Sequence, residues 1–148
     1  MRWYPSVTVA AVIRRQDRYL MVEERPAGSG VINQPAGHLE YGETLAEAVV
    51  REVLEETGCR FSPTGLVGVY QWTVPGTRQT YLRFCFCGEV YDPLPGQETD
   101  PDIVAARWMT LDEIASGNLP ARSPLVLRCI QDSLDSRPLN LDTLHALV

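Results

Sequence analysis

Three glutamates, Glu52, Glu55 and Glu56, stand at spacings of three and four residues. In a helix each residue turns by about 100°, so the three carboxylates spread over one side, in the sector of Ala48 and Val49. They therefore continue the apolar stripe that should face the protein body. Folding gains little from this, because Glu52 and Glu56 repel each other at i, i+4 and the last helical turn disfavours anions. Such carboxylates need a cation, and oxygen ligands suit Mg²⁺ or Mn²⁺.

The helix that carries these glutamates has clear ends in the sequence. Thr44 predicts its N-cap, and Glu47, three residues later, completes a capping box. Gly58 predicts its C-terminal stop, so we expect the helix over residues 45–57. The segment before it, residues 35–43, is expected to be a loop whose backbone comes close to a ligand at Ala36 and Gly37, where the glycine has no Cβ. Loop, helix and acidic face together predict a site for a metal ion and a diphosphate.

The order of residues 37–59 resembles the Nudix box. All the charged and glycine positions of that motif are present, namely Gly37, Glu43, Arg51, Glu52, Glu55, Glu56 and Gly58. The motif usually ends on a larger aliphatic residue, where this chain has Cys59. A buried cysteine behaves as a small hydrophobe, so this departure concerns packing more than chemistry.

The resemblance implies a hydrolase that uses Mg²⁺ or Mn²⁺. The implied metal ligands are three carboxylates and one backbone carbonyl, those of Glu52, Glu55, Glu56 and Gly37. Glu43 and Arg51 support them in the family. Arg51 is placed to orient the carboxylates through a fork-like pair, and a surface salt bridge is the alternative.

The general base has two candidate positions. Nudix enzymes place it either in the box or on a loop before the last strand, and here that loop is residues 96–102. Glu52 is the choice within the box. Asp102 is the preferred acid of the loop, from which it could also reach the metal, although an acidic loop is more often solvated.

Segments outside the box point to a narrower resemblance. NQPAGHLE at 33–40, Leu82-Arg83-Phe84 and residues 122–126 are similar to a bacterial group of Nudix phosphatases. That group releases inorganic phosphate from nucleoside di- and triphosphates and from the diphosphates of thiamine and its hydroxymethylpyrimidine precursor. It commonly carries Trp at the position of Ile32, so the specificity here differs if that Trp touches substrate. The alternatives are an ADP-ribose or dinucleoside pyrophosphatase and, because every box acid is kept, less readily a non-catalytic nucleotide-binding domain.

Aromatic and basic side chains are the candidates for substrate binding. Tyr81 and Arg83 lie two apart in an expected strand, so their side chains share one face. Tyr81 could stack on a ring and Arg83 could bind a terminal phosphate bidentately. Trp72 and Arg25 are further candidates. Alternatively, Trp72 is a core aromatic at a strand end. For Arg83, the alternative is that the strand face it shares with Tyr81 packs under a helix and that Arg83 pairs with an acid.

The remaining sequence predicts the elements that position these residues. We expect one domain over residues 1–148, large enough to bury a core. Its fold class is α/β, a Nudix-type α/β/α sandwich with a mixed sheet between helices. Strands are expected at 6–14, 19–24, 65–73, 80–91 and 105–109, and helices at 45–57, 110–117 and 123–133.

Composition and charge limit the kinds of binding partner and the location that we expect for this protein. The net charge of −6 disfavours a reader of nucleic-acid backbones, no run is long enough to cross a membrane, and no signal peptide is apparent. We therefore expect a cytoplasmic enzyme for a small-molecule phosphate or diphosphate substrate, without nucleic acid or membrane partners, as a monomer or alternatively a dimer. His38 and His145 lack partner motifs and are interpreted as incidental. The cysteines form no C-x-x-C pair and are expected to be reduced, mostly buried thiols: Cys59, Cys85, Cys87 and Cys129.

Overall fold

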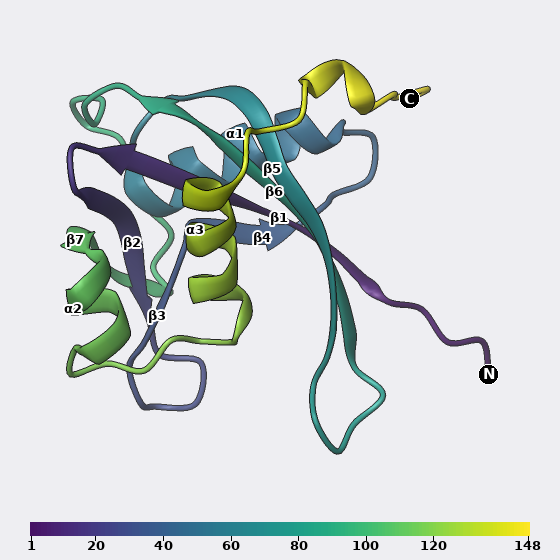
Figure 1. Cartoon of the computed structure of the whole chain (residues 1–148), viewed down its shortest axis with the longest axis horizontal. Coiled ribbons are helices and arrows are strands. Elements are labelled where there is room, and N and C mark those ends of the chain that lie inside the picture. Colours follow the sequence, from purple (N-terminus) through teal and green to yellow (C-terminus); the bar gives the residue numbers. More distant parts are fainter.

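A mixed sheet of seven strands forms the middle of the computed structural model, which describes residues 1–148 (Figure 1). The strands are β1 (Ser6–Arg15), β2 (Arg18–Glu24), β3 (Val31–Asn33), β4 (Ala36–His38), β5 (Phe61–Thr73), β6 (Thr80–Val90) and β7 (Ile103–Thr110). The helices are α1 (Leu45–Thr57), α2 (Leu111–Ser116), α3 (Leu125–Asp135) and the short 3₁₀ helix η1 (Leu141–Thr143). The predicted sandwich with a mixed sheet between helices is confirmed.

The sheet has two parts that meet at the β1–β2 hairpin. In the first part β1 pairs parallel with β6 and antiparallel with β4, and β5 follows at the edge beyond β6. In the second part β2 pairs antiparallel with both β3 and β7. The parallel β1–β6 pair is what makes the sheet mixed. The β5–β6 hairpin extends beyond the body of the molecule, as Figure 1 shows.

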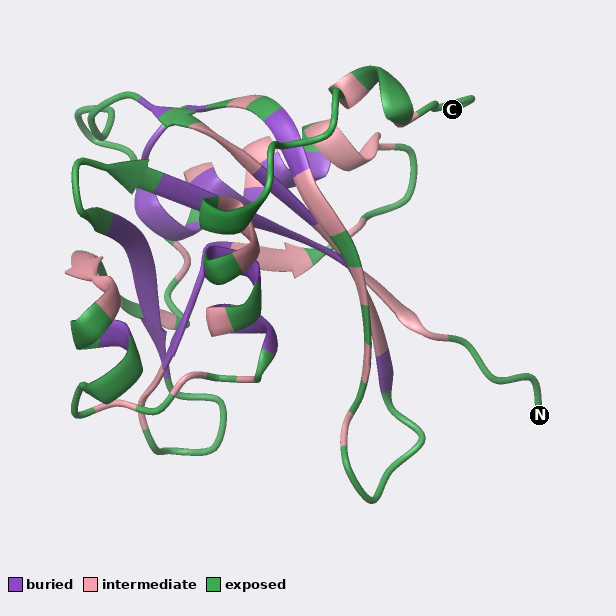
Figure 2. Cartoon of the chain, in the orientation of Figure 1, coloured by how far each residue is buried: buried purple, intermediate pink, exposed green.

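Alternation of side chains along β1 builds one core on each face of the sheet. Val9, Ala11 and Ile13 join the core beneath α1, whereas Ala10 and Val12 join the core beneath α2 and α3. Figure 1 accordingly shows α1 behind the strands and α2 and α3 in front, and Figure 2 shows the buried residues along the strands between them. The helices contribute Ala48, Val49 and Val53 to the first core and Ile114, Val126, Cys129 and Ile130 to the second.

The ends of the helices follow the capping signals closely. Helix α1 has the predicted bounds, with the Thr44 capping box and with Gly58 at a φ of 77°, a left-handed conformation that glycine adopts easily. A second capping box at Thr110 starts α2. Helix α3 starts one residue after Pro124, which is its N-cap, and ends two residues later than predicted.

Three short segments differ from the prediction. Residues 36–38 were expected to be loop but form β4, in which Gly37 lies opposite Val9 of β1. Strand β3 was not predicted, and β5 begins four residues earlier than predicted, at Phe61. Runs of three residues are too short to show a period of two, so these strands depend on pairing with distant segments. Pro63 and a bulge before Gly65 obscure the start of β5.

Candidate active site

Helix α1 turns two of its three glutamates into the protein. Glu52 and Glu56 are buried, with 9% and 6% of their surface exposed. Glu55 is exposed instead, with 48% of its side-chain surface accessible. The prediction that all three lean inward is therefore wrong for Glu55, because the buried face of α1 is centred near Val49 and Glu56 and Glu55 lies beyond its edge.

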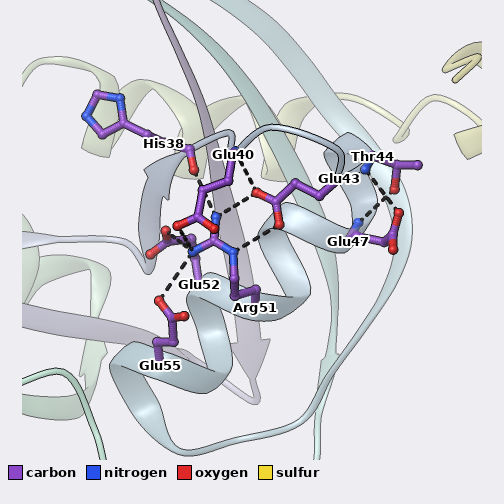
Figure 3. Close-up of polar contacts among 8 residues, drawn as sticks. All are labelled: His38, Glu40, Glu43, Thr44, Glu47, Arg51, Glu52 and Glu55. Carbon is purple, nitrogen blue, oxygen red and sulfur yellow. Dashed lines mark hydrogen bonds and ion pairs between the residues drawn. The ribbon is translucent and has the colours of Figure 1, made fainter. Parts of the chain in front are cut away.

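Arg51 ties these carboxylates to the loop before the helix, and all five of its N–H groups have acceptors (Figure 3). Nε and Nη2 form a bidentate pair with Glu43, at 3.0 and 2.7 Å. Nη1 donates to Glu52 at 2.7 Å and to Glu55 at 3.3 Å, and Nη2 also donates to the carbonyl of His38 at 2.9 Å. Arg51 thus pairs with Glu52 and Glu55 of the three glutamates, whereas Glu56 has no ion-pair partner.

The charges of this network stabilise the ionised forms of Arg51 and Glu43. Arg51 lowers the pKa of Glu43 by hydrogen bonding, and the carboxylates, Glu43 first, raise the pKa of Arg51. Both groups are therefore ionised at neutral pH. The fork-like partner of Arg51 is Glu43, and Glu52 receives a single hydrogen bond. With only 21% of its side-chain surface exposed, Arg51 is more enclosed than a surface salt bridge.

The backbone of β4 passes directly beneath the two buried glutamates. A Cβ at Gly37 would overlap the carboxylate of Glu52, so only glycine allows this approach. The N–H of Ala36 donates to Oε1 of Glu56 at 2.8 Å. The predicted close approach at Ala36 and Gly37 thus occurs, and it brings β4 against the acidic face of α1.

The environment of Glu56 lacks positive charge. Burial raises its pKa to about 9, the hydrogen bond from Ala36 opposes this, and the charges of Glu52, Glu24 and Asp100 raise it further. Burial also raises the pKa of Glu52. No three acidic or histidine side chains converge on a single point in this structure. The oxygen-only donors, the raised pKa values of Glu52 and Glu56, and the close approach of the Gly37 backbone to Glu52 nevertheless fit a divalent cation, which would supply the missing positive charge.

The raised pKa of Glu56 predicts how pH affects the metal-free protein. A carboxyl whose pKa rises from 4.5 to about 9 on folding stabilises the fold below pH 4.5 and loses this contribution as pH rises toward 9. We expect the melting temperature of the wild type, minus that of Glu56→Gln, to fall steadily between pH 5 and 9 in EDTA. Differential scanning fluorimetry measures this difference in melting temperature. A difference that rises with pH would contradict a buried Glu56 with a raised pKa.

A cavity of about 660 Å³ opens beside Glu56, between the two parts of the sheet. It brings together seven of the predicted site residues: Arg25, Gly37, Glu56, Trp72, Tyr81, Arg83 and Asp102. Glu43, Arg51, Glu52 and Glu55 lie outside its lining, in the network just described. His38, interpreted as incidental, also lines the cavity. The lining of the cavity thus includes an acidic end at Glu56 and an aromatic and basic end at Tyr81 and Arg83.

The aromatic and basic end is built by the β5–β6 hairpin. Trp72 and Tyr81 are cross-strand partners whose rings stack, with centroids 6.1 Å apart and planes 17° apart. Tyr81 and Arg83 share one strand face, as predicted, and both line the cavity. Trp72 is half-buried beside them, so the interpretation as a purely core aromatic is wrong.

Arg83 is a buried cation without an acidic partner. Only 7% of its surface is exposed, and its Nη1 donates to Oε1 of Gln34 at 2.9 Å. It takes part in none of the ion pairs of the structure. The alternative in which an acid neutralises Arg83 is therefore wrong. Arg25 differs, because it is exposed and pairs with Glu23 at 3.5 Å.

The loop before β7 is hydrogen-bonded to the last turn of α1. The N–H of Asp100 donates to the carbonyl of Glu55 at 2.6 Å, and the N–H of Asp102 donates to the carboxylate of Asp100 at 2.9 Å. Both acids line the cavity. Asp102 was the predicted residue, but Asp100 is the acid whose charge acts on Glu56. Sequence spacing alone does not show which of two acids, two positions apart in a loop, lies near Glu56.

Several cavity residues were not named as site residues, although Asn33, Asp100 and Arg122 lie in segments that the sequence analysis singled out: Thr8, Glu24, Asn33, Asp100 and Arg122. Glu24 and Arg122 form an ion pair across 98 positions, which no spacing reveals. Ile32 is buried in the core beneath α2 and α3 and does not line the cavity. Cys59 is buried in the core beneath α1, where it fills the closing position of the box.

Comparison with known proteins identifies the class to which this fold and site belong. The model of the NUDIX domain matches residues 4–129, so the chain belongs to the Nudix hydrolase family. Among named relatives, it is 44% identical over 131 residues to Phosphatase NudJ of Escherichia coli K12, covering 86% of this chain and 84% of that protein. It is also similar to a solved NUDIX hydrolase from Nitrosomonas europaea, with 48% identity, a TM-score of 0.92 and 97% of both chains covered.

A more distant solved structure shows the fold alone. The NUDIX domain of Shewanella oneidensis NrtR, solved with ADP ribose, aligns with a TM-score of 0.71 at 17% identity over 90% of both chains. Together with the family match and the NudJ relatives, the fold makes this chain a hydrolase that acts on phosphoric anhydride bonds. None of its helices is both long and apolar enough to cross a membrane.

Proposed function

We propose that this hydrolase is a divalent-metal-dependent phosphatase for nucleoside di- and triphosphates or thiamine-type diphosphates. The observation that carries the proposal is the single cavity that joins an acidic end at Glu56 to an aromatic and basic end at Tyr81 and Arg83. Such a cavity suits a substrate with a phosphate chain at one end and a ring at the other. The 44% identity to a relative named as a phosphatase supports the release of inorganic phosphate.

The acidic end is our proposed metal site. We assign Glu52, Glu55, Glu56 and the carbonyl of Gly37 as ligands of Mg²⁺ or Mn²⁺, with Asp102 joining from its loop. When bound, the ion neutralises phosphate oxygens and lowers the pKa of a water. Glu55 reaches this site only by releasing one hydrogen bond to Arg51, which at 3.3 Å is the longest of the five.

The proton of the attacking water passes to a carboxylate. We assign this role to Glu52, which lies over the backbone at Gly37. Arg51 positions Glu52 through its hydrogen bond of 2.7 Å, and Glu43 in turn positions Arg51. The water attacks phosphorus, the bond to the bridging oxygen breaks, and inorganic phosphate leaves. Because such transition states are loose, placement and charge dominate the rate.

The basic end is our proposed site for the rest of the substrate. Across neighbouring strands, Arg83 of β6 lies opposite Thr8 of β1, and Thr8 lies opposite His38 of β4. Two strand spacings, about 10 Å, therefore separate the backbone of Arg83 from β4, which leaves room for a phosphate chain. Arg83 then holds an outer phosphate while Tyr81 and Trp72 contact the ring, and Arg25 adds positive charge at the rim.

A phosphate-release screen tests this function. With Mg²⁺ present, we expect a nucleoside diphosphate, a nucleoside triphosphate or a thiamine-type diphosphate to give the highest kcat/KM, with inorganic phosphate as product. ADP-ribose and dinucleoside polyphosphates serve as competitors in the same assay. If one of these is the best substrate, the chain is a pyrophosphatase of the alternative kind. Action as a monomer and location in the cytoplasm stay predictions.

A further inference from the structure

Gln34 is a buried amide that joins the first turn of α3 to the guanidinium of Arg83. It lies between β3 and β4, is 1% exposed and does not line the cavity. Its Nε2 donates to the carbonyl of Val126 at 3.2 Å, and its Oε1 accepts from Nη1 of Arg83 at 2.9 Å. Gln34 therefore lies behind the site, in contact with a residue that lines it.

The two partners set the direction of this amide. A guanidinium offers only donors, and a backbone carbonyl only accepts. The reversed amide would place its NH₂ group against the N–H groups of Arg83 and its oxygen against the carbonyl of Val126, so both hydrogen bonds would be lost. Gln34 therefore presents its oxygen to Arg83 in one defined position.

A neutral acceptor holds the guanidinium without cancelling its charge. A carboxylate in the same place would form an ion pair with Arg83 and compete with any anion in the cavity. An apolar side chain would leave the buried Nη1 without this acceptor, which is unfavourable. The thiol of Cys129 also lies near the guanidinium, but a thiol is a weak acceptor. Gln34 thus suits a site in which the positive charge of Arg83 is kept for a ligand.

We propose that Gln34 is a positioning residue for substrate binding, which directs the guanidinium of Arg83 toward the outer phosphate and leaves it fully charged. Gln34 acts through Arg83 and does not touch the substrate itself. Helix α3 takes part through the carbonyl of Val126, to which the amide is bonded. This inference rests on the proposed function, because that function assigns the phosphate contact to Arg83.

The direct test removes the acceptor and keeps a side chain of similar length, as in Gln34→Met. The ligand is ADP, and calorimetry in excess EDTA measures its Kd in the absence of the proposed metal-dependent reaction. We expect Kd to rise about 2- to 10-fold, the range of one hydrogen bond to a neutral partner. With Mg²⁺ present, the same change should raise KM more than it lowers kcat. An unchanged Kd, or no binding of ADP by the wild type, overturns the proposal.

A double-mutant cycle separates positioning from a general effect on the fold. If Gln34 acts through Arg83, adding Gln34→Met to Arg83→Met should weaken ADP binding no further, although each single change weakens it. A loss of binding that is equally large in both backgrounds contradicts this role. Melting temperatures are recorded for all three variants. A purely structural amide would lower them and leave the Kd of the folded protein unchanged.

Gln34→Glu tests whether the partner must be neutral. The carboxylate keeps an acceptor for Nη1 but adds a negative charge beside the cation, so ADP should bind more weakly than to the wild type. Binding as tight as that of the wild type would contradict the claim that the charge of Arg83 is kept for the substrate.

Gln131→Met is the matched control for these variants. It makes the same chemical change at an exposed position of α3, where Gln131 bonds to Asp135 outside the cavity. Its Kd for ADP and its kinetics should equal those of the wild type. An effect as large as that of Gln34→Met would show that the loss at Gln34 is not specific.

Failure of this proposal differs from failure of the proposed function. If ADP and the other diphosphates yield no phosphate with Mg²⁺ but the cycle in EDTA shows that Gln34 acts through Arg83, the positioning role holds and the assigned reaction is wrong. If phosphate is released efficiently and Gln34→Met changes neither Kd nor KM, only the positioning role is wrong.

Discussion

Replacing Glu56 by glutamine should lower kcat/KM by at least about 100-fold, equivalent to about 2.7 kcal/mol of transition-state stabilisation, while the protein stays folded. Glutamine keeps the oxygen that accepts the N–H of Ala36. It also removes the cost of keeping a carboxyl protonated at pH 8, a cost that the raised pKa of Glu56 imposes on the wild type, so the melting temperature of the metal-free protein at pH 8 should be unchanged or higher. Steady-state phosphate release and thermal melting on one preparation measure both effects.

Glu47→Gln is the matched control for this prediction. It makes the same chemical change on the same helix, at an exposed position of the capping box, which accepts either Glu or Gln at this place. Its activity and stability should stay close to those of the wild type. If Glu56→Gln retains most of the wild-type kcat/KM, Glu56 is not a metal ligand.

Arg83→Ala is expected to cost a charge-assisted contact with the outer phosphate. Such contacts contribute about 1.5–3 kcal/mol, so kcat/KM should fall about 10- to 150-fold. Arg83→Lys should recover only part of this loss, because the planar fork of the guanidinium is gone. The basis is a cation that is buried, lines the cavity and has no acidic partner.

Two further variants separate binding from stability at this position. Arg83→Met keeps much of the packing volume, so it should lose the same activity as Arg83→Ala with a smaller change in melting temperature. Arg128→Ala removes an exposed arginine of α3 that pairs with Asp132 outside the cavity, and its kinetics should stay unchanged. A lower melting temperature with unaltered kcat/KM in both Arg83 variants would assign Arg83 to folding.

Helix α1 could be predicted from the sequence because its signals are local. Thr44 and Glu47 mark the start of the helix, and Gly58 marks its end. The spacing of Glu52 and Glu56 predicts that both side chains point into the protein. The pairing of Tyr81 and Arg83 on one strand face follows from the period of two in the same way. These features depend only on residues a few positions apart.

Other features depend on contacts that sequence spacing does not encode. Strand β4 forms because β1 pairs with it, and which edge of the acidic arc is exposed depends on how α1 packs against the sheet. The orientation of Asn33 requires Glu24, nine positions away, and Arg122, much further along the chain. The side chains of Asn33 and Thr8 carry no sequence signal that marks them as buried or that marks one polar atom of each as unpaired.

The measurement that bears most directly on the central claim is phosphate release from the best substrate as a function of free divalent metal. We expect activity to disappear in excess EDTA and to return on addition of Mg²⁺ or Mn²⁺, because we assign Glu52, Glu55 and Glu56 as ligands of an ion that the proposed reaction needs. Full turnover in excess EDTA would contradict the assignment of these glutamates and the mechanism built on them.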